Sequence, residues 1–300
     1  MTTTAFIFPG QGGQFAGQGK PWFERSASVR ELFKLADEVT QRPVSRLCFE
    51  GPLEELSLTV NLQPAVLAVG LAGALLHLEA GLVPSFAAGH SLGEFGALCL
   101  AGVLTEAEVF ALVAKRAALM QKAAMHSPGV MSAVLNLSGE ALEGACELGR
   151  AEGVVVVANF NTPGQTVISG TARAVAAAVR HAQSLGGRAV SLPVSGAFHS
   201  PLMNESSALF ADELGELDFK PPKFPVVPNV LGTPVTDPDE LKNLLSEQMT
   251  SPVRWLETVK SLELAGVDSW AECWPRPYLG SMVKKCLEPG RRAAVACPAQ

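Results

Sequence analysis

The chain has 300 residues, of which 48% are hydrophobic and 17% are charged. This composition is typical of a globular protein with a large core, and it excludes a disordered chain. The net charge is −6 and Lys and Arg form no cluster, which argues against a nucleic-acid-binding protein. We therefore expect no nucleic-acid partner, and an acidic protein partner would need a local basic patch.

The cysteines and the apolar stretches indicate where such a chain works. The six cysteines are scattered and form neither a Cys-x-x-Cys pair nor a zinc spacing, as expected in a reducing compartment. The first residues lack the basic region of a signal peptide, and Pro9-Gly10 interrupts the apolar run that follows. The apolar stretch 65–76 is too short to span a bilayer, so we interpret it as a core helix. We expect a cytoplasmic protein without membrane contact.

Short apolar strands alternate with helical stretches over the first part of the chain. Predicted strands occupy residues 5–8 and 84–88. Stretches with helical spacing of apolar residues are 27–40, 52–58, 64–80 and 106–124. Thr105 and Glu108 form a capping box at the start of the last of these. This alternation predicts an α/β fold with a mostly parallel sheet covered by helices.

The pattern changes between residues 129 and 194. Strands are predicted at 130–137, 154–160, 166–169 and 188–194, with helices at 139–149 and 171–184. The order β-α-β-β-α-β is that of a ferredoxin-like split unit. We expect a small subdomain, 127–195, inserted into a large one formed by 1–126 and 196–285. A Pro-rich stretch, 221–228, leads to one more strand, helices fill the C-terminal part, and residues 286–300 are predicted to be a loosely ordered tail.

Gly89-His90-Ser91-Leu92-Gly93 joins the predicted strand at 84–88 to an apolar helical stretch at 95–103. A serine between glycines on a strand-to-helix turn is held out of the backbone as a nucleophile. The helix N-terminus beyond it favours negative charge. The same pattern occurs in ordinary glycine turns, so both interpretations stay open.

Ser91 would need a base, and His199 is the best candidate among the five histidines. It follows a predicted strand and precedes a helix that starts with Pro201, a position typical of catalytic loop residues. A purely structural histidine is the alternative. No aspartate lies between Ser91 and His199, although hydrolases of the nucleophile-elbow type have their acid there. Either the acid follows His199, or a backbone carbonyl orients the imidazole.

Two further features carry possible chemistry. Arg116 shares the apolar face of its predicted helix, and a buried guanidinium needs an anion. That anion is either a structural glutamate or a substrate carboxylate held by two hydrogen bonds, unless the side chain reaches the surface. The loop Phe8-Pro-Gly-Gln-Gly-Gly-Gln14 leaves the first strand with free backbone N–H groups. It is either a glycine turn or, together with the N–H of Leu92, one side of an oxyanion hole.

Together these features resemble the malonyl-CoA:acyl-carrier-protein transacylase family of fatty-acid and polyketide synthesis. The resemblance runs from about residue 5 to 285. Its motifs are Phe8-Pro-Gly-Gln-Gly-Gly-Gln14, Gln63-Pro64, Gly89-His-Ser-Leu-Gly-Glu94, Arg116, Asn159-Phe-Asn-Thr-Pro-Gly-Gln165, Gly196-Ala-Phe-His-Ser200, Asn229 and Pro252-Val-Arg-Trp255. It implies an α/β-hydrolase-like large subdomain, a ferredoxin-like insert, and an active site in the cleft between them.

The resemblance also implies roles for individual residues. Ser91 would be the nucleophile and His199 the general base and acid, oriented by the backbone carbonyl of Gln248. The backbone N–H groups of Gln11 and Leu92 would form the oxyanion hole. The substrate-binding residues would be Arg116, as the clamp of the malonyl carboxylate, and Gln63, Phe198 and Asn159. The implied partners are malonyl-CoA and an acyl carrier protein, with no metal or redox cofactor, and we expect a monomer.

One departure from the family pattern concerns the C-terminal loop. Family members carry an acidic residue followed by Gly-Pro-Gly, whereas this chain has Glu272-Cys-Trp-Pro-Arg-Pro277. Trp274 and Arg276 replace both glycines and require a different local path. Other activities stay open on this fold: the malonyl transferase of a malonate decarboxylase, an acyltransferase of a polyketide system, and a hydrolase that releases acyl groups. A catalytically inactive scaffold that docks a carrier protein is the non-enzymatic alternative.

Overall fold

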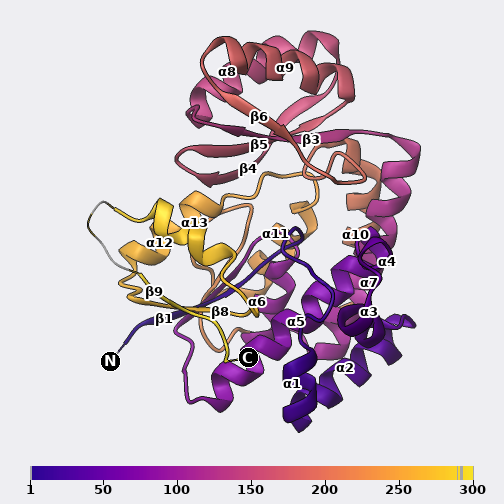
Figure 1. Ribbon diagram of the computed structural model, residues 1–300, viewed down its shortest axis with the longest axis vertical. Coiled ribbons are helices and arrows are strands. Elements are labelled where there is room, and N and C mark those ends of the chain that lie inside the picture. The colour runs from indigo at the N-terminus through magenta and orange to yellow at the C-terminus, as the bar shows by residue number, and fades with distance from the viewer. Residues whose placement is uncertain (1, 289, 291–292, 300) are drawn as a thin grey trace.

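The protein contains two β-sheets of different kinds. The computed structural model describes residues 2–288, 290 and 293–299. A five-stranded sheet lies in the lower, larger part, and a four-stranded sheet with two helices lies above it (Figure 1). The prediction of an α/β fold with a mostly parallel large sheet and a separate small sheet is confirmed.

The large sheet has the order β7-β2-β1-β8-β9, and every pair of neighbours in it is parallel. Its strands are Thr4–Phe8 (β1), Phe86–Gly89 (β2), Val226–Val227 (β7), Ser269–Glu272 (β8) and Ala294–Ala296 (β9). β1 is buried along its whole length, as expected for a strand of a parallel sheet whose residues after Thr4 are all apolar. The loops after β1 and β2 leave the same edge of the sheet, where open parallel sheets bind their ligands.

Helices pack on both faces of this sheet. Phe6 and Phe8 of β1 belong to one hydrophobic core, and Ala5 and Ile7 belong to a second core on the opposite face. The helices of this part are Lys20–Arg25 (α1), Ala27–Thr40 (α2), Val44–Glu50 (α3), Leu53–Leu56 (α4), Thr59–Glu79 (α5), Gly93–Leu100 (α6), Glu106–His126 (α7), Asn204–Gly215 (α10), Pro238–Glu247 (α11), Trp255–Leu264 (α12) and Leu279–Cys286 (α13). The sequence did not predict α1 and α3, which are short.

Helix α5 is apolar around its whole circumference. By length and composition it could cross a membrane, but 89% of its most apolar window is buried inside the fold. A helix that is hydrophobic all round is buried, so the interpretation as a core helix is confirmed. The helix begins at Thr59, before the predicted start at residue 64.

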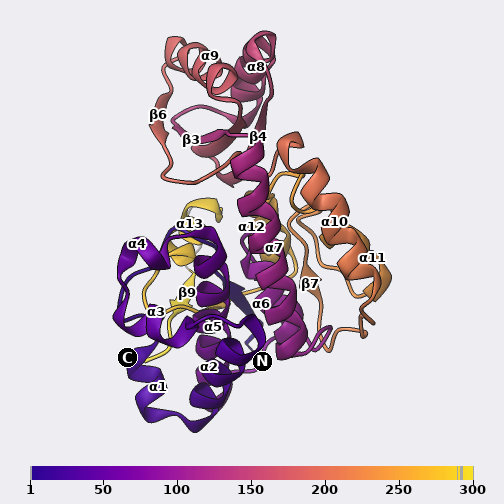
Figure 2. The ribbon, with the colours of Figure 1, turned by 90° about the vertical axis from the view of Figure 1, so that its right-hand side faces the viewer.

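Helix α7 carries the predicted capping box. The Thr105 hydroxyl accepts a hydrogen bond from Glu108 N at 3.3 Å, and a Glu108 carboxylate oxygen accepts one from Thr105 N at 2.7 Å. From there α7 runs upward through the large part towards the small sheet (Figure 2). Its middle contributes Arg116 to the interior, where the side chain is 1% exposed.

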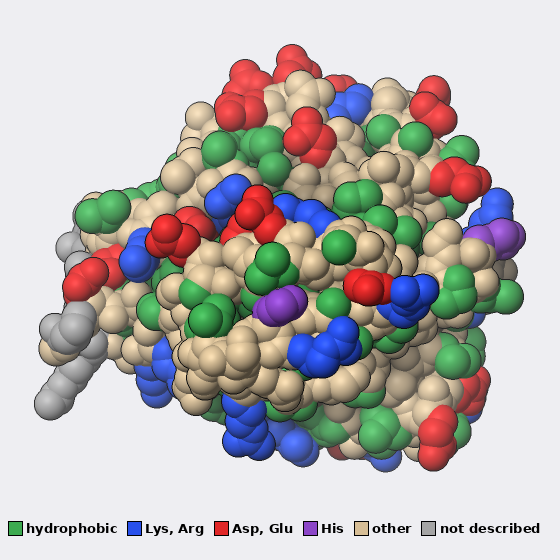
Figure 3. All heavy atoms as spheres, turned by 90° about the horizontal axis from the view of Figure 1, so that it is seen from above, with side chains coloured by type: hydrophobic (Ala, Val, Ile, Leu, Met, Phe, Trp, Pro, Cys, Tyr) green, Lys and Arg blue, Asp and Glu red, His purple; other side chains and the backbone are tan. Residues whose placement is uncertain are grey.

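The small sheet has the order β4-β5-β3-β6 and is antiparallel. Its elements are Val130–Leu135 (β3), Gly139–Gly149 (α8), Val155–Thr162 (β4), Gln165–Gly170 (β5), Ala172–Ser184 (α9) and Arg188–Ser191 (β6). The predicted order β-α-β-β-α-β is therefore confirmed. Seen from above, this end of the molecule shows acidic and basic side chains interspersed (Figure 3). Exposed ion pairs such as Arg150 with Glu143 at 2.5 Å belong to it.

One prediction for the C-terminal tail was wrong. Residues 294–296 lie in the stretch expected to be loosely ordered, yet they form β9 parallel to β8. This strand is only three residues long and follows a Pro-Gly-Arg-Arg segment, so its sequence carries almost no periodic signal. The edge of β8 supplies the hydrogen-bonding partner, and the partly buried Val295 packs against the second core. Residues 289, 291, 292 and 300 of the tail lie outside the described residues.

Two short 3-10 helices in the described part of the chain, Arg150–Glu152 and Pro201–Met203, complete the elements.

Candidate active site

Ser91 lies on a sharp turn between β2 and α6. Its φ of 50° is in the left-handed region, which is strained for a residue with a side chain. A Cβ on Gly89 would come within 1.9 Å of the Gly93 carbonyl carbon, and one on Gly93 within 2.0 Å of Phe8 O. Only glycine therefore fits at either position. This close packing presents the Ser91 hydroxyl at the edge of the sheet, as a nucleophile requires.

The structure brings His199 to Ser91. The Ser91 Oγ and His199 Nε2 are 2.7 Å apart, although the two residues lie on separate loops. His199 itself has a φ of 56° in the loop before the 3-10 helix Pro201–Met203. Two strained residues that meet through their functional atoms are typical of an active site.

Backbone carbonyls orient the imidazole. His199 Nδ1 lies 3.0 Å from Gln248 O and 3.1 Å from Ser251 O. Because carbonyl oxygens only accept hydrogen bonds, Nδ1 carries the ring proton. Nε2 is then the acceptor of the Ser91 hydroxyl proton, which is the arrangement of a general base. Of the two alternatives left open by the sequence, the geometry matches a carbonyl as the orienting group.

Arg116 approaches Ser91 from helix α7. Its Nη2 donates to Ser91 Oγ at 3.3 Å and to Gln248 Oε1 at 2.9 Å, while Nη1 donates to Gln63 Oε1 at 2.7 Å. The Nε atom is buried and has no hydrogen-bond partner among the described residues. The guanidinium is held by neutral amides and one hydroxyl. It forms no ion pair with a carboxylate in the described part of the chain.

The loop after β1 packs against the serine turn. A Cβ on Gly10 would lie 2.6 Å from His90 O, so Gln11 follows a point of direct backbone contact. Within the described residues, no hydrogen bond uses the backbone N–H of Gln11 or of Leu92. Both groups are therefore available as donors beside Ser91, as an oxyanion hole requires.

The C-terminal loop that departs from the family pattern supports this loop from the other side. Trp274 is buried, and its Nε1 lies 3.4 Å from a Cβ placed on Gly13. The Arg276 guanidinium stacks 3.6 Å above the centre of the Phe15 ring. The Tyr278 hydroxyl donates to Gln11 O at 3.5 Å. The larger side chains thus fill the space beside the Gln11 loop and leave the serine, histidine and arginine untouched.

A pocket of about 560 Å³ opens over these residues between the two parts of the protein. Gln11, Ser91 and His199 line it from the large part, and Asn159 lines it from β4 of the small sheet. Phe198, only 2% exposed, lies on its wall. Of the other site residues predicted from the sequence, Leu92 follows Ser91 at the start of α6. Gln63 and Gln248 do not line the pocket, and both are hydrogen-bonded to Arg116, which contacts Ser91.

Sequence reasoning gave no role to four residues that hold the site together, although all four lie in the quoted motifs. Asn229 accepts a hydrogen bond from Ser91 N at 2.6 Å and donates to Gly89 O at 2.6 Å, which locks the turn. Glu94 is buried at the start of α6 and accepts from Gln248 Nε2 at 2.8 Å. His90 and Asn161 join the turn to β4 through a 2.9 Å hydrogen bond. Apart from these motifs, the one available signal was an acidic residue that opens an otherwise apolar helix.

Burial governs the ionisation of the site. Burial, together with the charge of Arg116, lowers the pKa of His199 to about 3. It also lowers the pKa of Arg116 to about 10, so that the guanidinium stays charged at neutral pH. The site therefore combines a neutral imidazole, ready to accept a proton, with a buried cation that no carboxylate of the described residues contacts directly.

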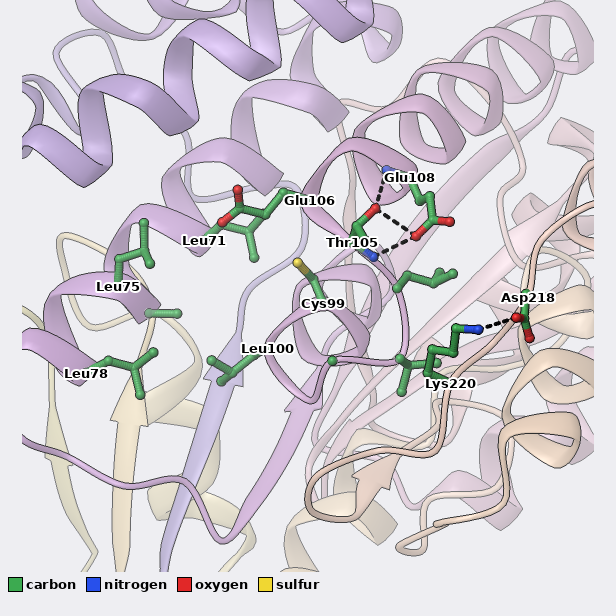
Figure 4. A pocket seen from close by; sticks show the side chains of 14 residues that line it. Leu71, Leu75, Leu78, Cys99, Leu100, Thr105, Glu106, Glu108, Asp218 and Lys220 are labelled. Atoms are coloured by element: carbon green, nitrogen blue, oxygen red, sulfur yellow. Dashed lines mark hydrogen bonds and ion pairs between the residues drawn. The ribbon is translucent and has the colours of Figure 1, made fainter.

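A second hollow lies elsewhere, between α5, α6 and α7, and has a volume of about 570 Å³ (Figure 4). Leucines of α5 form much of its wall. Four of its polar side chains are engaged with each other: Thr105 with Glu108 in the capping box, and Lys220 with Asp218. Burial raises the pKa of the Cys99 thiol to about 12, so this sulfur is not a nucleophile at neutral pH. The catalytic geometry is thus found in the first pocket.

Comparisons with known proteins agree with this placement. Residues 5–298 match the family model described as acyl transferase domain. The malonyl CoA-acyl carrier protein transacylase of Bacillus subtilis (strain 168) is 41% identical over 300 residues, which cover 99% of this chain and 95% of the relative. The crystal structure of an acyl carrier protein S-malonyltransferase from Vibrio cholerae has a TM-score of 0.94 at 36% identity, with 99% of this chain and 98% of that chain covered.

A third relative was solved together with its partner. It is a malonyl-transacylase in complex with a type II polyketide-synthase acyl-carrier protein, with a TM-score of 0.93, 34% identity, and coverage of 99% of this chain and 97% of that chain. The chain therefore belongs to the acyl transferase family. Within it the chain groups with the malonyl CoA-acyl carrier protein transacylases, the family that its motifs resemble.

Proposed function

We propose that this chain is a malonyl-CoA:acyl-carrier-protein S-malonyltransferase that works through an acyl-serine intermediate. The observation that carries the proposal is a buried cation beside the nucleophile: Arg116 Nη2 lies 3.3 Å from Ser91 Oγ, which in turn is 2.7 Å from His199 Nε2. A short diacid esterified to Ser91 would have its free carboxylate near this guanidinium. The relatives, whose names specify malonyl-CoA and an acyl carrier protein, support the same substrates.

In the first half-reaction Ser91 Oγ attacks the thioester carbon of malonyl-CoA while His199 Nε2 takes the hydroxyl proton. The N–H groups of Gln11 and Leu92 donate to the oxygen that becomes negatively charged. When the tetrahedral intermediate collapses, the C–S bond breaks. The imidazolium then returns its proton to the departing coenzyme A thiolate.

The second half-reaction runs the same chemistry towards a different thiol. The phosphopantetheine thiol of the carrier protein gives its proton to His199 and attacks the acyl-serine carbonyl carbon. The ester C–O bond breaks, and Ser91 Oγ regains the proton from the imidazolium. The carboxylate stays paired with Arg116 throughout, so the acyl group keeps its orientation between the two steps.

The surroundings of Arg116 support selection of a diacid. With a neutral acyl group, the buried guanidinium would keep only amide and hydroxyl partners, which is unfavourable. Gln63 Oε1 accepts a hydrogen bond from Nη1 at 2.7 Å and so fixes one edge of the guanidinium. We assign Phe198 and Asn159 to the wall that limits the size of the acyl group. These side chains line the pocket on opposite subdomains of the proposed division, 1–126 with 196–285 and 127–195.

Neither half-reaction needs a metal or redox group, because the thioester is already activated and all proton transfers pass through His199. We propose that coenzyme A enters as a substrate carrier and not as a resident cofactor. We further propose a cytoplasmic location. All six cysteines are free thiols, which suits a reducing compartment.

The test is an intact-mass measurement after mixing the chain with malonyl-CoA. We expect a malonyl adduct on Ser91, no adduct in the Ser91→Ala variant, and transfer of the label when a carrier protein in its phosphopantetheine form is added. A folded chain that forms no adduct would instead support the inactive docking scaffold. An adduct lost to water without a carrier would support a hydrolase.

A second candidate carrier follows from the relative solved with a polyketide-synthase carrier protein. The chain would then serve a polyketide system and not fatty-acid synthesis. Transfer rates to one carrier protein of each type, measured from the same malonyl-enzyme, distinguish the two, because only the second half-reaction involves the carrier.

A further inference from the structure

Glu94 is a buried acid that the mechanism above does not use. It lies three positions after the nucleophile in α6, and its side chain is 1% exposed. One carboxylate oxygen, Oε2, accepts hydrogen bonds from Gln248 Nε2 at 2.8 Å and from Asn229 N at 3.1 Å. Buried carboxylates are costly unless they are paired, so this residue calls for a functional explanation.

The Gln248 amide links Glu94 to Arg116. Its Nε2 donates to Glu94 at 2.8 Å, and its Oε1 accepts from Arg116 Nη2 at 2.9 Å. The negative and positive charges are thus separated by a single amide group. The same residue holds His199 through its backbone carbonyl at 3.0 Å. Gln248 is therefore the common support of the base and of the cation, and Glu94 fixes its side chain.

The charged groups around Glu94 are few. Of the elements packed on α6, strands β1, β2 and β7 carry no ionisable side chain. Helix α5 carries His77 and Glu79 at its far end, and α7 contributes Arg116. The loops at the site add His90 and His199. Burial raises the pKa of Glu94 to about 7, against the opposing influence of its hydrogen bonds and of Arg116.

We propose that Glu94 is the counter-charge of Arg116, a positioning residue that limits how strongly the guanidinium attracts the carboxylate of the substrate. The proposal rests on the proposed function, because it takes the malonyl carboxylate as the ligand of Arg116. When that carboxylate binds, two acids share one cation, and Glu94 takes up a proton. A purely structural carboxylate has the opposite effect, because its removal loosens Gln248 and weakens binding.

The test uses the full chain with Ser91→Ala, which binds malonyl-CoA without reacting. In this background Glu94→Gln keeps an oxygen that accepts from Gln248 and removes the charge. We expect malonyl-CoA to bind roughly 3- to 10-fold more tightly, as for the loss of one like charge across a partly screened gap. Coenzyme A itself, which lacks the carboxylate, keeps its affinity. Unchanged or weaker binding of malonyl-CoA by the folded variant overturns the proposal.

Calorimetry in buffers of different ionisation enthalpy gives a second measurement. At pH 8 we expect proton uptake when malonyl-CoA binds, none when coenzyme A binds, and none with Glu94→Gln. The matched control is Glu106→Gln, a partly buried carboxylate at the start of α7 that belongs to no contact of the site. This control should leave both affinity and proton uptake unchanged. Proton uptake that persists in Glu94→Gln would contradict the proposal.

Two further arms keep the outcomes separate. If Glu94→Gln fails to fold, the Ser91→Ala chain alone is titrated from pH 8 to pH 6. The affinity for malonyl-CoA relative to coenzyme A should rise as Glu94 becomes protonated, and a constant ratio refutes the proposal. The proposed function is judged independently, by the malonyl adduct on Ser91 of the wild-type chain. If the wild-type chain forms the adduct but Glu94→Gln does not bind malonyl-CoA more tightly, only the role of Glu94 is rejected and the proposed function stands.

Discussion

Replacing Arg116 with alanine separates the recognition of the carboxylate from the chemistry at the serine. The guanidinium is 1% exposed, and its Nη2 lies 3.3 Å from Ser91 Oγ. If it pairs with the malonyl carboxylate, Arg116→Ala leaves that carboxylate without a partner in a buried site. Acetyl-CoA has no such group, so its transfer should be affected only through the weak contact with Ser91.

The size of the effect follows from the burial of the pair. Truncating one partner of a buried, hydrogen-bonded charge pair costs about 2–5 kcal/mol. At about 1.4 kcal/mol per factor of ten, kcat/KM for malonyl-CoA should fall roughly 30-fold to a few thousand-fold. The long contact with Ser91 is worth about 1 kcal/mol, which corresponds to about a five-fold loss with acetyl-CoA.

The assay measures formation of the acyl-enzyme from malonyl-CoA and from acetyl-CoA in a single turnover, so the carrier protein does not enter. The neighbouring Lys115 provides the control, because its ammonium pairs at the surface with Glu213 at 2.5 Å. Lys115→Ala should change neither rate. Equal losses with both substrates in a folded Arg116→Ala variant would refute the carboxylate clamp.

Three other predictions concern the base, the turn and the thiols. At saturating malonyl-CoA, the acylation rate should stay constant from pH 8 down to pH 5. Burial and Arg116 lower the pKa of His199 to about 3, so the imidazole loses its basic form only as the pH falls through that value. A decline in rate centred near pH 6.5 would contradict this. Asn229→Ala leaves Ser91 N and Gly89 O unpaired, so thermal unfolding should show a loss of about 1–3 kcal/mol and acylation should slow equally for both acyl groups. Burial raises the pKa values of Cys48 and Cys286 to about 12, so a disulfide reagent at pH 7.5 should label them only slowly and leave transfer intact; rapid labelling with loss of activity would disprove the assignment.

Local patterns predicted most of the fold because the signals lie close together in sequence. The capping box of Thr105 and Glu108 marks the start of α7, and the six elements of the small sheet follow in the predicted order. The β9 strand escaped prediction because its pairing depends on the edge of β8, to which the chain returns only after α13. Such long-range pairing has no trace in local periodicity.

The site residues also divide into those that local sequence identified and those that only long-range contacts define. Ser91 was identifiable from the glycines on either side. Both must be glycine, because Gly89 packs directly on Gly93, and Gly93 packs on the backbone of Phe8. His199 and Arg116 were candidates, but their meeting at Ser91 depends on the fold. Asn229 and Glu94 could not be assigned, because an amide that locks a turn and an acid that supports a glutamine are defined by their partners.

The use of a carbonyl, in place of the usual carboxylate, to orient His199 follows from the presence of Arg116. Gln248, whose backbone carbonyl orients His199, also contacts the guanidinium, because its side-chain Oε1 lies 2.9 Å from Nη2, so a carboxylate in this region would attract the guanidinium. The two would form a buried ion pair and neutralise the cation that the substrate requires. A neutral carbonyl fixes the same tautomer at 3.0 Å without this competition, although it stabilises the imidazolium less. A thioester tolerates the weaker base, since its leaving thiolate is far more stable than the amine released from an amide. The negative charge is placed one amide further out, on Glu94, where it moderates Arg116 without occupying the position of the substrate.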